Sequence, residues 1–478
     1  MMKLMATAVL SAAVFSASEG GIPWSEVAIE SSSESVTAIS VPSNDHGTQT
    51  QDVNSILAAA RGTNPAMCAM ASRNIQSYEW GDWDDAPVTP LSRAGVQRTR
   101  RGFASGSDGR SGEFAPGEVS TLLDAIGSDD ACVREIAVRL MGRRRSDEVV
   151  TGLLSRLSSN VVPTREVAAY GLGLQRSTRS VDPLQRALRD AESGVRGNAA
   201  WALGRIRAGS SLSALAGMLN DSDERVREAV VTSIGQVDSA SSYPALLRVA
   251  QRDESPRVRR VAVWAIAQIR ARDGADALGA IAQQDRDALV REMAVWAIGD
   301  IHARGAVNAV TSVLRGDSDD RVRETAAWAL GEMGDRNAID ALGGAAASDR
   351  SIQVRGTAAW AIGQLGRRSG MRVPSGVVSL LSSENDDARK KAAWALGEVG
   401  DSTVIDAVRN ALAKETRSDV RSALTRALVK SGGRSRATLE QLLESKDPAT
   451  REAAIRGLTG RDAMNPWPWP WPRPRPFP

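Results

Sequence analysis

The chain has 478 residues, of which 24% are charged and 42% hydrophobic, and its formal net charge is only +3 because 60 basic side chains face 57 acidic ones. This length exceeds one ordinary hydrophobic core. The near balance of interleaved charges argues against nucleic acid as a partner, and two histidines and two cysteines supply no set with metal-ligand spacing. We expect no catalytic residue, no metal and no cofactor.

The first 18 residues resemble a cleavable secretory signal. One lysine precedes an apolar run from Leu4 to Ala17, and Val14 and Ser16 suit the small-residue positions of a cleavage site. The run is short for a membrane span. Residues 1–18 therefore predict export to the periplasm or cell envelope. The alternatives are an uncleaved anchor or an ordinary first helix, and if the signal interpretation is wrong the protein is expected to be cytoplasmic.

Three further segments precede the main array. Residues 19–51 are rich in Ser, Thr and acidic groups and are expected to be flexible. Residues 52–76 favour two short helices that cap the array, and residues 77–114 are typical of a linker. Cys68 lies in the expected cap and Cys132 in the first repeat. A bridge between them would pin the cap to the array, whereas the alternative is two buried thiols that never meet.

A unit that is expected to form two helices recurs from residue 115 to 461. Its second helix carries the most recognisable motif, as in VRETAAWALG at Val322–Gly331. Its arginine returns every 30 to 34 residues, from Arg134 to Arg451, which indicates about eleven stacked units. An aspartate six residues before the arginine is expected to pair with an arginine along the stack. This predicted ladder comprises Asp190, Arg196, Asp221, Arg227, Asp253, Arg259, Asp285, Arg291, Asp317, Arg323, Asp349 and Arg355.

The pattern Val-Arg followed by AAWALG resembles the HEAT repeat, specifically the phycobilisome-lyase HEAT-like subgroup. The resemblance implies an all-α solenoid of two-helix repeats. It says little about function, because such repeats occur in scaffolds, inhibitors, pigment lyases, a hydroxylase and DNA glycosylases. The hydroxylase branch binds iron through His-Glu pairs, whereas neither His46 nor His302 is followed by Glu. A bilin-lyase activity remains the enzyme-class alternative, and nucleic-acid binding is a second.

An aromatic column marks the second helix of successive repeats. Helical periodicity indicates that these side chains point away from the core of their own repeat. The resemblance places the second helices on the concave side of the array. Together these two points predict a groove lined by Trp201, Trp264, Trp296, Trp328, Trp360 and Trp394. The alternative is that each ring packs against the next repeat. Mixed charges flank the column at Glu228, Arg260, Glu292, Glu324, Lys390, Arg205, Gln268, Asp300, Glu332, Gln364 and Glu398.

The tail at 462–478 ends in NPWPWPWPRPRPFP, with proline at every second position. This sequence predicts a polyproline II arm, whose contact residues are Trp467, Trp469 and Trp471. Three interpretations stay open: docking into an aromatic groove, peripheral contact with a membrane, or no contact at all. A further hypothesis places the tail in the Trp groove of its own or a neighbouring molecule.

Together these patterns predict a non-catalytic scaffold of the cell envelope. Aromatic anchors within a mixed-charge surround suit a protein or peptide partner. If the groove accepts segments like the chain's own tail, we expect this partner to be rich in proline.

Overall fold

A computed structural model describes residues 53–64, 67–68, 71–72, 114–237, 239–271, 274–366 and 371–431, with separate residues between 440 and 455. The described residues belong to one compact unit, and the regular structure within them is entirely helical, as the repeat predicted. The predicted signal peptide at 1–18, the Ser-rich segment at 19–51, nearly all of the linker at 77–114 and the tail at 462–478 lie outside the described residues.

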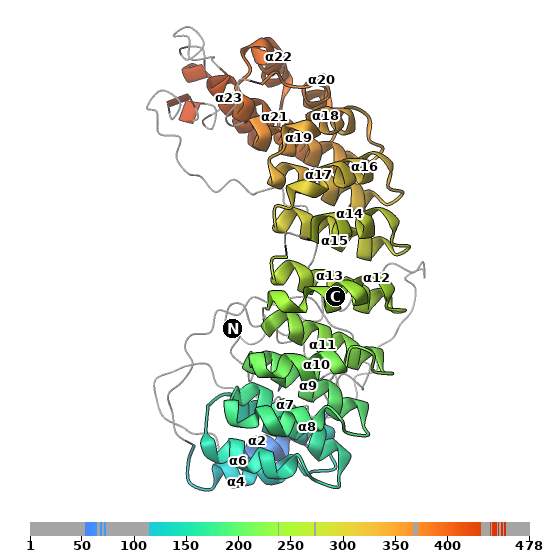
Figure 1. Cartoon of the computed structure of the whole chain (residues 1–478). Coiled ribbons are helices and arrows are strands. Elements are labelled where there is room, and N and C mark those ends of the chain that lie inside the picture. Colours follow the sequence, from blue (N-terminus) through green and yellow to red (C-terminus); the bar gives the residue numbers. More distant parts are fainter. Residues whose placement is uncertain are drawn as a thin grey trace, which may run out of the picture. The chain divides into compact units, whose positions relative to one another are not determined.

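Within the described residues, ten helix pairs follow one another from residue 118 to residue 430 (Figure 1). The first helices of the pairs are α4 (Glu118–Ala125), α6 (Asp147–Arg156), α8 (Val181–Ala187), α10 (Leu212–Gly217), α12 (Tyr243–Arg252), α14 (Ala275–Gln284), α16 (Val307–Gly316), α18 (Ile339–Ser348), α20 (Ser375–Ser379) and α22 (Ile405–Lys414). The second helices are α5 (Ala131–Gly142), α7 (Val162–Gln175), α9 (Ser193–Ile206), α11 (Glu224–Val237), α13 (Pro256–Gln268), α15 (Ala288–Asp300), α17 (Asp320–Met333), α19 (Ile352–Gly366), α21 (Asp386–Val399) and α23 (Ser418–Lys430). Only separate residues of the expected eleventh repeat are described.

Each second helix packs against its own first helix and against the second helices of the neighbouring repeats. Its start is set by side-chain caps: the carboxylate of Asp319 accepts hydrogen bonds from the backbone N–H groups of Arg321 and Val322, and Asp287 does the same for Leu289 and Val290. Caps of this kind satisfy donors that have no partner within the helix. The repeating caps therefore start the second helix at the same point of each of these units.

The N-terminal cap is fastened to the first repeat at two points. Helix α2 (Val53–Ala60) packs on α4 and α5, and Cys68 is joined to Cys132 of α5 by a disulfide with a Cα–Cα distance of 5.7 Å. The backbone N–H of Gly62 donates to the carboxylate of Asp130 at 2.8 Å, and this same carboxylate caps α5. Closing a loop of 64 residues is worth about 4 kcal/mol on the chain-entropy model.

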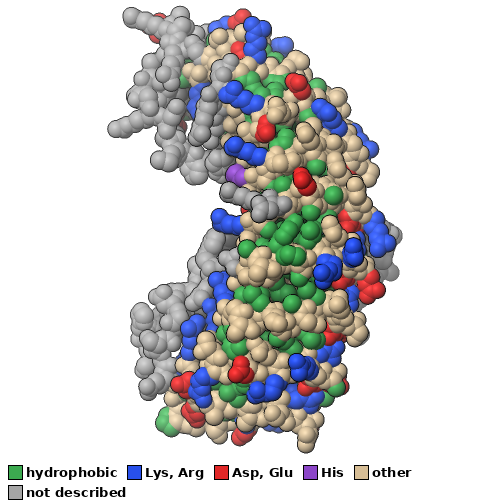
Figure 2. Space-filling view, in the orientation of Figure 1, with side chains coloured by type: hydrophobic (Ala, Val, Ile, Leu, Met, Phe, Trp, Pro, Cys, Tyr) green, Lys and Arg blue, Asp and Glu red, His purple; other side chains and the backbone are tan. Residues whose placement is uncertain are grey.

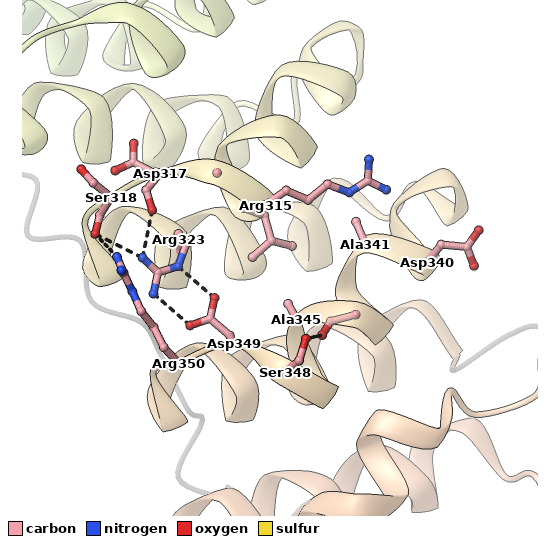
Figure 3. A pocket seen from close by; sticks show the side chains of 13 residues that line it. Arg315, Asp317, Ser318, Arg323, Asp340, Ala341, Ala345, Ser348, Asp349 and Arg350 are labelled. Atoms are coloured by element: carbon pink, nitrogen blue, oxygen red, sulfur yellow. Dashed lines mark hydrogen bonds and ion pairs between the residues drawn. The ribbon is translucent and has the colours of Figure 1, made fainter.

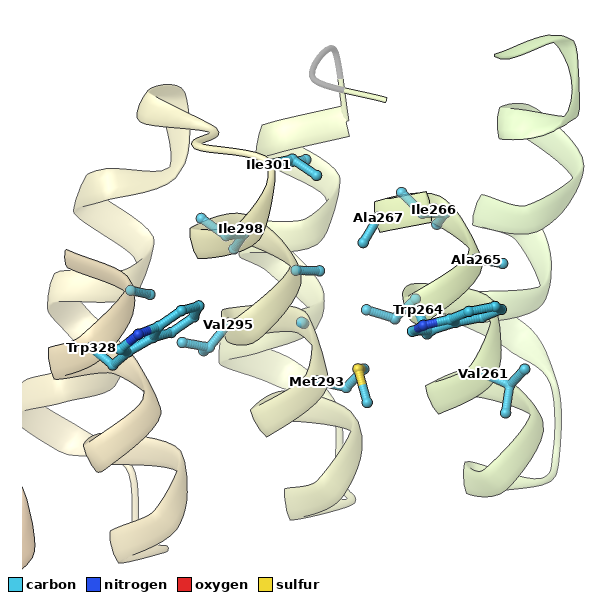
Figure 4. Close-up of a cluster of buried hydrophobic side chains, with 14 of the residues drawn as sticks. Val261, Trp264, Ala265, Ile266, Ala267, Met293, Val295, Ile298, Ile301 and Trp328 are labelled. Atoms are coloured by element: carbon cyan, nitrogen blue, oxygen red, sulfur yellow. The ribbon is translucent and has the colours of Figure 1, made fainter. Parts of the chain in front are cut away.

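Neighbouring second helices approach closely because glycine faces tryptophan. In Figure 4 the indole of Trp328 on α17 points toward Val295 of the preceding helix α15. A β-carbon placed on Gly299 of α15 would lie 2.8 Å from Cζ3 of this indole and 2.9 Å from Cβ of Ala329. The same relation joins Gly173 to Trp201, Gly235 to Trp264, Gly331 to Trp360 and Gly363 to Trp394. We call this arrangement the glycine slot.

We predict that Gly299→Ala destabilises the array by about 1 to 3 kcal/mol, because the added methyl group overlaps both Trp328 and Ala329. Gly344→Ala is the matched control. This glycine also lies inside a helix, but a β-carbon there meets nothing within 4 Å, so the substitution should stabilise by about 0.5 to 1 kcal/mol. Urea denaturation followed by circular dichroism measures both changes. Equal midpoints for the two variants would contradict the glycine slot.

Candidate functional site

The predicted ladder is present up to Arg323, and each of these arginines reaches the acidic residue of the following repeat. Arg259 Nε and Nη2 donate to the two carboxylate oxygens of Asp285, both at 2.8 Å, and the two side chains are only 3% and 8% exposed. Equivalent bidentate pairs, with distances of 2.7 to 3.0 Å, join Arg165 to Asp190, Arg196 to Asp221, Arg227 to Asp253, Arg291 to Asp317 and Arg323 to Asp349.

Each arginine that makes such a bidentate pair also donates to a carbonyl oxygen in the turn that precedes its own helix. Arg323 Nη1 donates to the carbonyl oxygen of Asp317 at 2.9 Å (Figure 3), while the carboxylate of Asp317 accepts from Arg291 and from the backbone N–H of Asp319 at 2.9 Å. Burial opposes ionisation, but these hydrogen bonds prevail and hold the pKa of Asp317 below its ordinary value. The ladder therefore couples the shape of each turn to the stacking of repeats.

The prediction is wrong for Arg355. Ser383 occupies the position where the acidic partner would stand, and Arg355 Nε donates instead to the carbonyl oxygen of Ala346 at 3.1 Å. One repeat later the ladder resumes with a longer side chain, because Arg389 pairs with Glu415 at 2.7 and 3.3 Å. A pocket of about 530 Å³ between α16 and α18 has the Arg323–Asp349 pair in its wall (Figure 3), so these charges are already satisfied.

The structure contradicts the predicted groove of exposed tryptophans. The exposed fractions of Trp201, Trp264, Trp328 and Trp360 are 1%, 2%, 5% and 2%. Their rings point away from the core of their own repeat, as the helical periodicity indicated, but they enter the glycine slot of the preceding repeat. The rings of Trp360 and Trp394 stack with centroids 6.4 Å apart. The alternative of packing against a neighbouring repeat is therefore correct for these four.

Trp296 and Trp394 are only partly buried. For Trp296, the partial exposure has a reason in the preceding repeat: Ala267 stands at the position of the slot glycine, so its methyl group occupies space that the ring would otherwise enter. Gly363 does lie under Trp394, so a missing slot does not explain the partial exposure of that ring. Trp467, Trp469 and Trp471 of the predicted tail contact lie outside the described residues.

One stretch of the second-helix face combines partly exposed apolar groups with carboxylates. On α15 the side chains at helical spacing are Leu289, which is 42% exposed, the nearly buried Glu292, the partly exposed Trp296 and the exposed Asp300. Glu324 and Glu332 occupy the equivalent positions on α17 and are partly exposed. We name these six residues the acidic-aromatic patch. The sequence pointed to all of them except Leu289, whose counterparts in the neighbouring repeats, Arg257 and Arg321, are charged.

The carboxylates of the patch are not neutralised as fully as those of the ladder. Glu292 has one long contact, 3.5 Å to Arg321, and burial raises its pKa despite the charge of that arginine. Burial likewise raises the pKa of Glu332; the charge of His302 opposes this change and that of Asp300 adds to it. Glu324 accepts a hydrogen bond from the hydroxyl of Thr357 at 3.0 Å. A cation bound at the patch would therefore find carboxylates that lack a close cationic partner.

We also searched the described residues for a metal site, a basic patch and a membrane-spanning helix. They contain no group of three or more His, Cys, Asp and Glu side chains arranged to hold a metal ion. On the face shown in Figure 2, basic side chains are scattered among acidic ones and do not gather in one patch. Within the same described part of the chain, every helix is too short or too polar to cross a bilayer.

Stacked helix pairs tied by a buried arginine ladder define an α-solenoid. The family model for HEAT repeats matches residues 150–231, 212–298, 275–363 and 344–429, which together make up more than half of the chain, and the chain belongs to this family. No curated protein matches the sequence.

Solved structures with a similar fold include importin beta in an ammonium sulfate condition, with a TM-score of 0.55 and 12% identity over 85% of this chain and 64% of that one. Kap121p bound to Pho4p matches with a TM-score of 0.50 and 13% identity over 71% of this chain and 45% of that one. The chain thus spans less than two thirds of either protein, and at these identities the likeness concerns the fold alone. The complex of CpcE and CpcF of phycocyanin lyase from Nostoc sp. PCC7120 shares 21% identity over 52% of this chain and 94% of that one, but its TM-score of 0.30 carries no functional argument.

We predict that Arg259→Met costs about 3 to 5 kcal/mol, because it leaves the carboxylate of Asp285 buried without its cation. Arg355→Met is the matched control. It removes one hydrogen bond to a carbonyl oxygen and should cost only about 1 kcal/mol. Urea denaturation gives the two losses, and hydrogen exchange in α13 and α15 locates the first. Losses of the same size would show that the ladder adds nothing beyond helix packing.

Proposed function

We propose that the chain is a non-catalytic scaffold that binds an extended polypeptide segment at the acidic-aromatic patch. The observation that carries this proposal is the alternation of apolar and acidic side chains along α15: exposed Leu289, then Glu292, partly exposed Trp296 and exposed Asp300. Alternating chemistry of this kind matches a ligand that presents apolar and basic groups in turn.

The dimensions of the patch suit such a ligand. From Leu289 to Asp300 the helix rises about 16 Å, which an extended segment covers in about five residues. Partly exposed aromatic and aliphatic groups would anchor the segment, while the carboxylates would receive Lys or Arg side chains and free backbone N–H groups. Kap121p, which shares the fold, is bound to Pho4p in its solved structure, which supports a protein ligand.

The test is fluorescence anisotropy of a labelled peptide library against the full chain and two variants. Leu289→Ser/Asp300→Asn/Glu332→Gln removes one apolar and two acidic groups of the patch. We expect the best peptides, rich in basic and apolar residues, to lose at least about tenfold in affinity, or roughly 1.4 kcal/mol.

The control is Val161→Ser/Asp340→Asn, which removes an apolar side chain that is 54% exposed and an exposed carboxylate from other repeats. It should bind as the unmodified chain does. Loss of binding in the control alone, or no binding peptide at all, would overturn the proposed function.

The same proposal includes a place of action, the periplasm or cell envelope. Two observations support it: the apolar run of residues 4–17 and the disulfide between Cys68 and Cys132, since such bonds persist in oxidising compartments. Mass spectrometry of the protein from its source cells should find an N-terminus near Ser18 and no free thiol. An intact Met1 together with two free cysteines would place the protein in the cytoplasm.

A further inference from the structure

The chain itself contains a segment with the chemistry that the acidic-aromatic patch lacks. Residues 465–478, outside the described residues, read NPWPWPWPRPRPFP and carry three indoles followed by Arg473 and Arg475, with no acidic residue. Proline in every second position predicts an extended arm with little freedom to lose on binding. Such an arm presents apolar groups and then cations. The more exposed groups of α15 follow a matching order, since the apolar Leu289 and Trp296 precede the acidic Asp300.

The carboxylates best placed to receive those cations are Asp300 and Glu332. They occupy equivalent positions on α15 and α17, and the described residues provide no ion pair for either one. Adjacent packed helices lie about 8 to 10 Å apart, while residues two apart in a polyproline II arm are about 6 Å apart. Two arginine side chains easily span the difference, so one can face each carboxylate.

The length of the chain permits contact within one molecule. Ile455, the last described residue, precedes Arg473 by 18 residues, which reach about 60 Å when extended. From the repeats of α15 and α17 to the eleventh repeat there are four to five steps of about 10 Å each, or roughly 40 to 50 Å. The arm can therefore return along the stack as far as the patch.

We propose that residues 465–478 bind the acidic-aromatic patch of their own chain, with Arg473 and Arg475 at Asp300 and Glu332 and with tail indoles against Leu289 and Trp296. This inference rests on the proposed function of the patch and adds a regulator to it, because a bound tail competes with other polypeptides. The buried rings of Trp328 and Trp360 take no part, so the contact differs from an aromatic groove along the whole array.

The first experiment is photocrosslinking in the full chain with p-benzoylphenylalanine at position 477, in place of Phe477. Mass spectrometry should map the adducts to α15 and α17, and mixing isotope-labelled with unlabelled chains should show that they form within one molecule. Arg473→Glu/Arg475→Glu should abolish these adducts, and adding Asp300→Arg/Glu332→Arg should restore them. Adducts on other repeats, or adducts between copies only, would overturn the proposal.

The second experiment separates this inference from the proposed function. If the tail competes, Arg473→Glu/Arg475→Glu should bind the best library peptides about tenfold more tightly than the unmodified chain. Equal affinities, with adducts away from the patch, would contradict binding of the tail and leave the proposed scaffold function standing. Adducts at the patch without any library binding would support binding of the tail and contradict the proposed scaffold function. If the charge reversal abolishes cosedimentation with anionic phospholipid vesicles and leaves the crosslinks unchanged, the arginines serve a membrane and the proposal fails.

Discussion

The two-pronged contact between an arginine and the carboxylate of the next repeat is the constraint on which the array depends. At Asp285 the carboxylate is held from one side by Arg259 and from the other by the N–H of Asp287. If the turn changed its shape, the carboxylate would lose its hydrogen bonds from the arginine. If one repeat slid along the next, the arginine could no longer hold the carboxylate that shapes the turn. A buried ion pair adds little net stability over an apolar contact of the same volume, so its importance here lies in fixing the register between repeats.

That fixed register allows the glycine slots to form, and the slots in turn determine what the outer face offers. Because most indoles of the aromatic column are used to join repeats, only a narrow stripe of each second helix stays accessible between its neighbours. Recognition then depends on the residues on either side of the column. The patch on α15 and α17 stands out because Ala267 fills the place of a slot glycine and an exposed leucine follows the cap of α15.

The periodic features were predictable from the sequence because they need only local chemistry. The caps, the helix pairs and nearly all of the ladder follow from residues at fixed offsets within one repeat or between two. The burial of Trp328 was not predictable from a helical projection, because that projection shows the core of one repeat but not the position of the next. A signal was nevertheless present, since the glycine three residues after the column leaves a space beside it, and at Gly299 and Gly331 the ring of the next repeat fills that space. The exposure of Leu289 was missed because its counterparts in adjacent repeats are charged.

Every contact that joins two repeats connects residues about one period apart, and this makes the array modular in length. If the residues after Arg259 up to and including Arg291 were removed, Arg259 would pair with Asp317, which Arg291 holds in the present chain. Trp296 would then face Gly235, which now lies opposite Trp264. Gain or loss of a whole unit thus preserves the stacking while it moves the N-terminal cap and the C-terminal arm relative to each other by about 10 Å. The solenoid is in this sense a spacer that can be lengthened or shortened in equal steps.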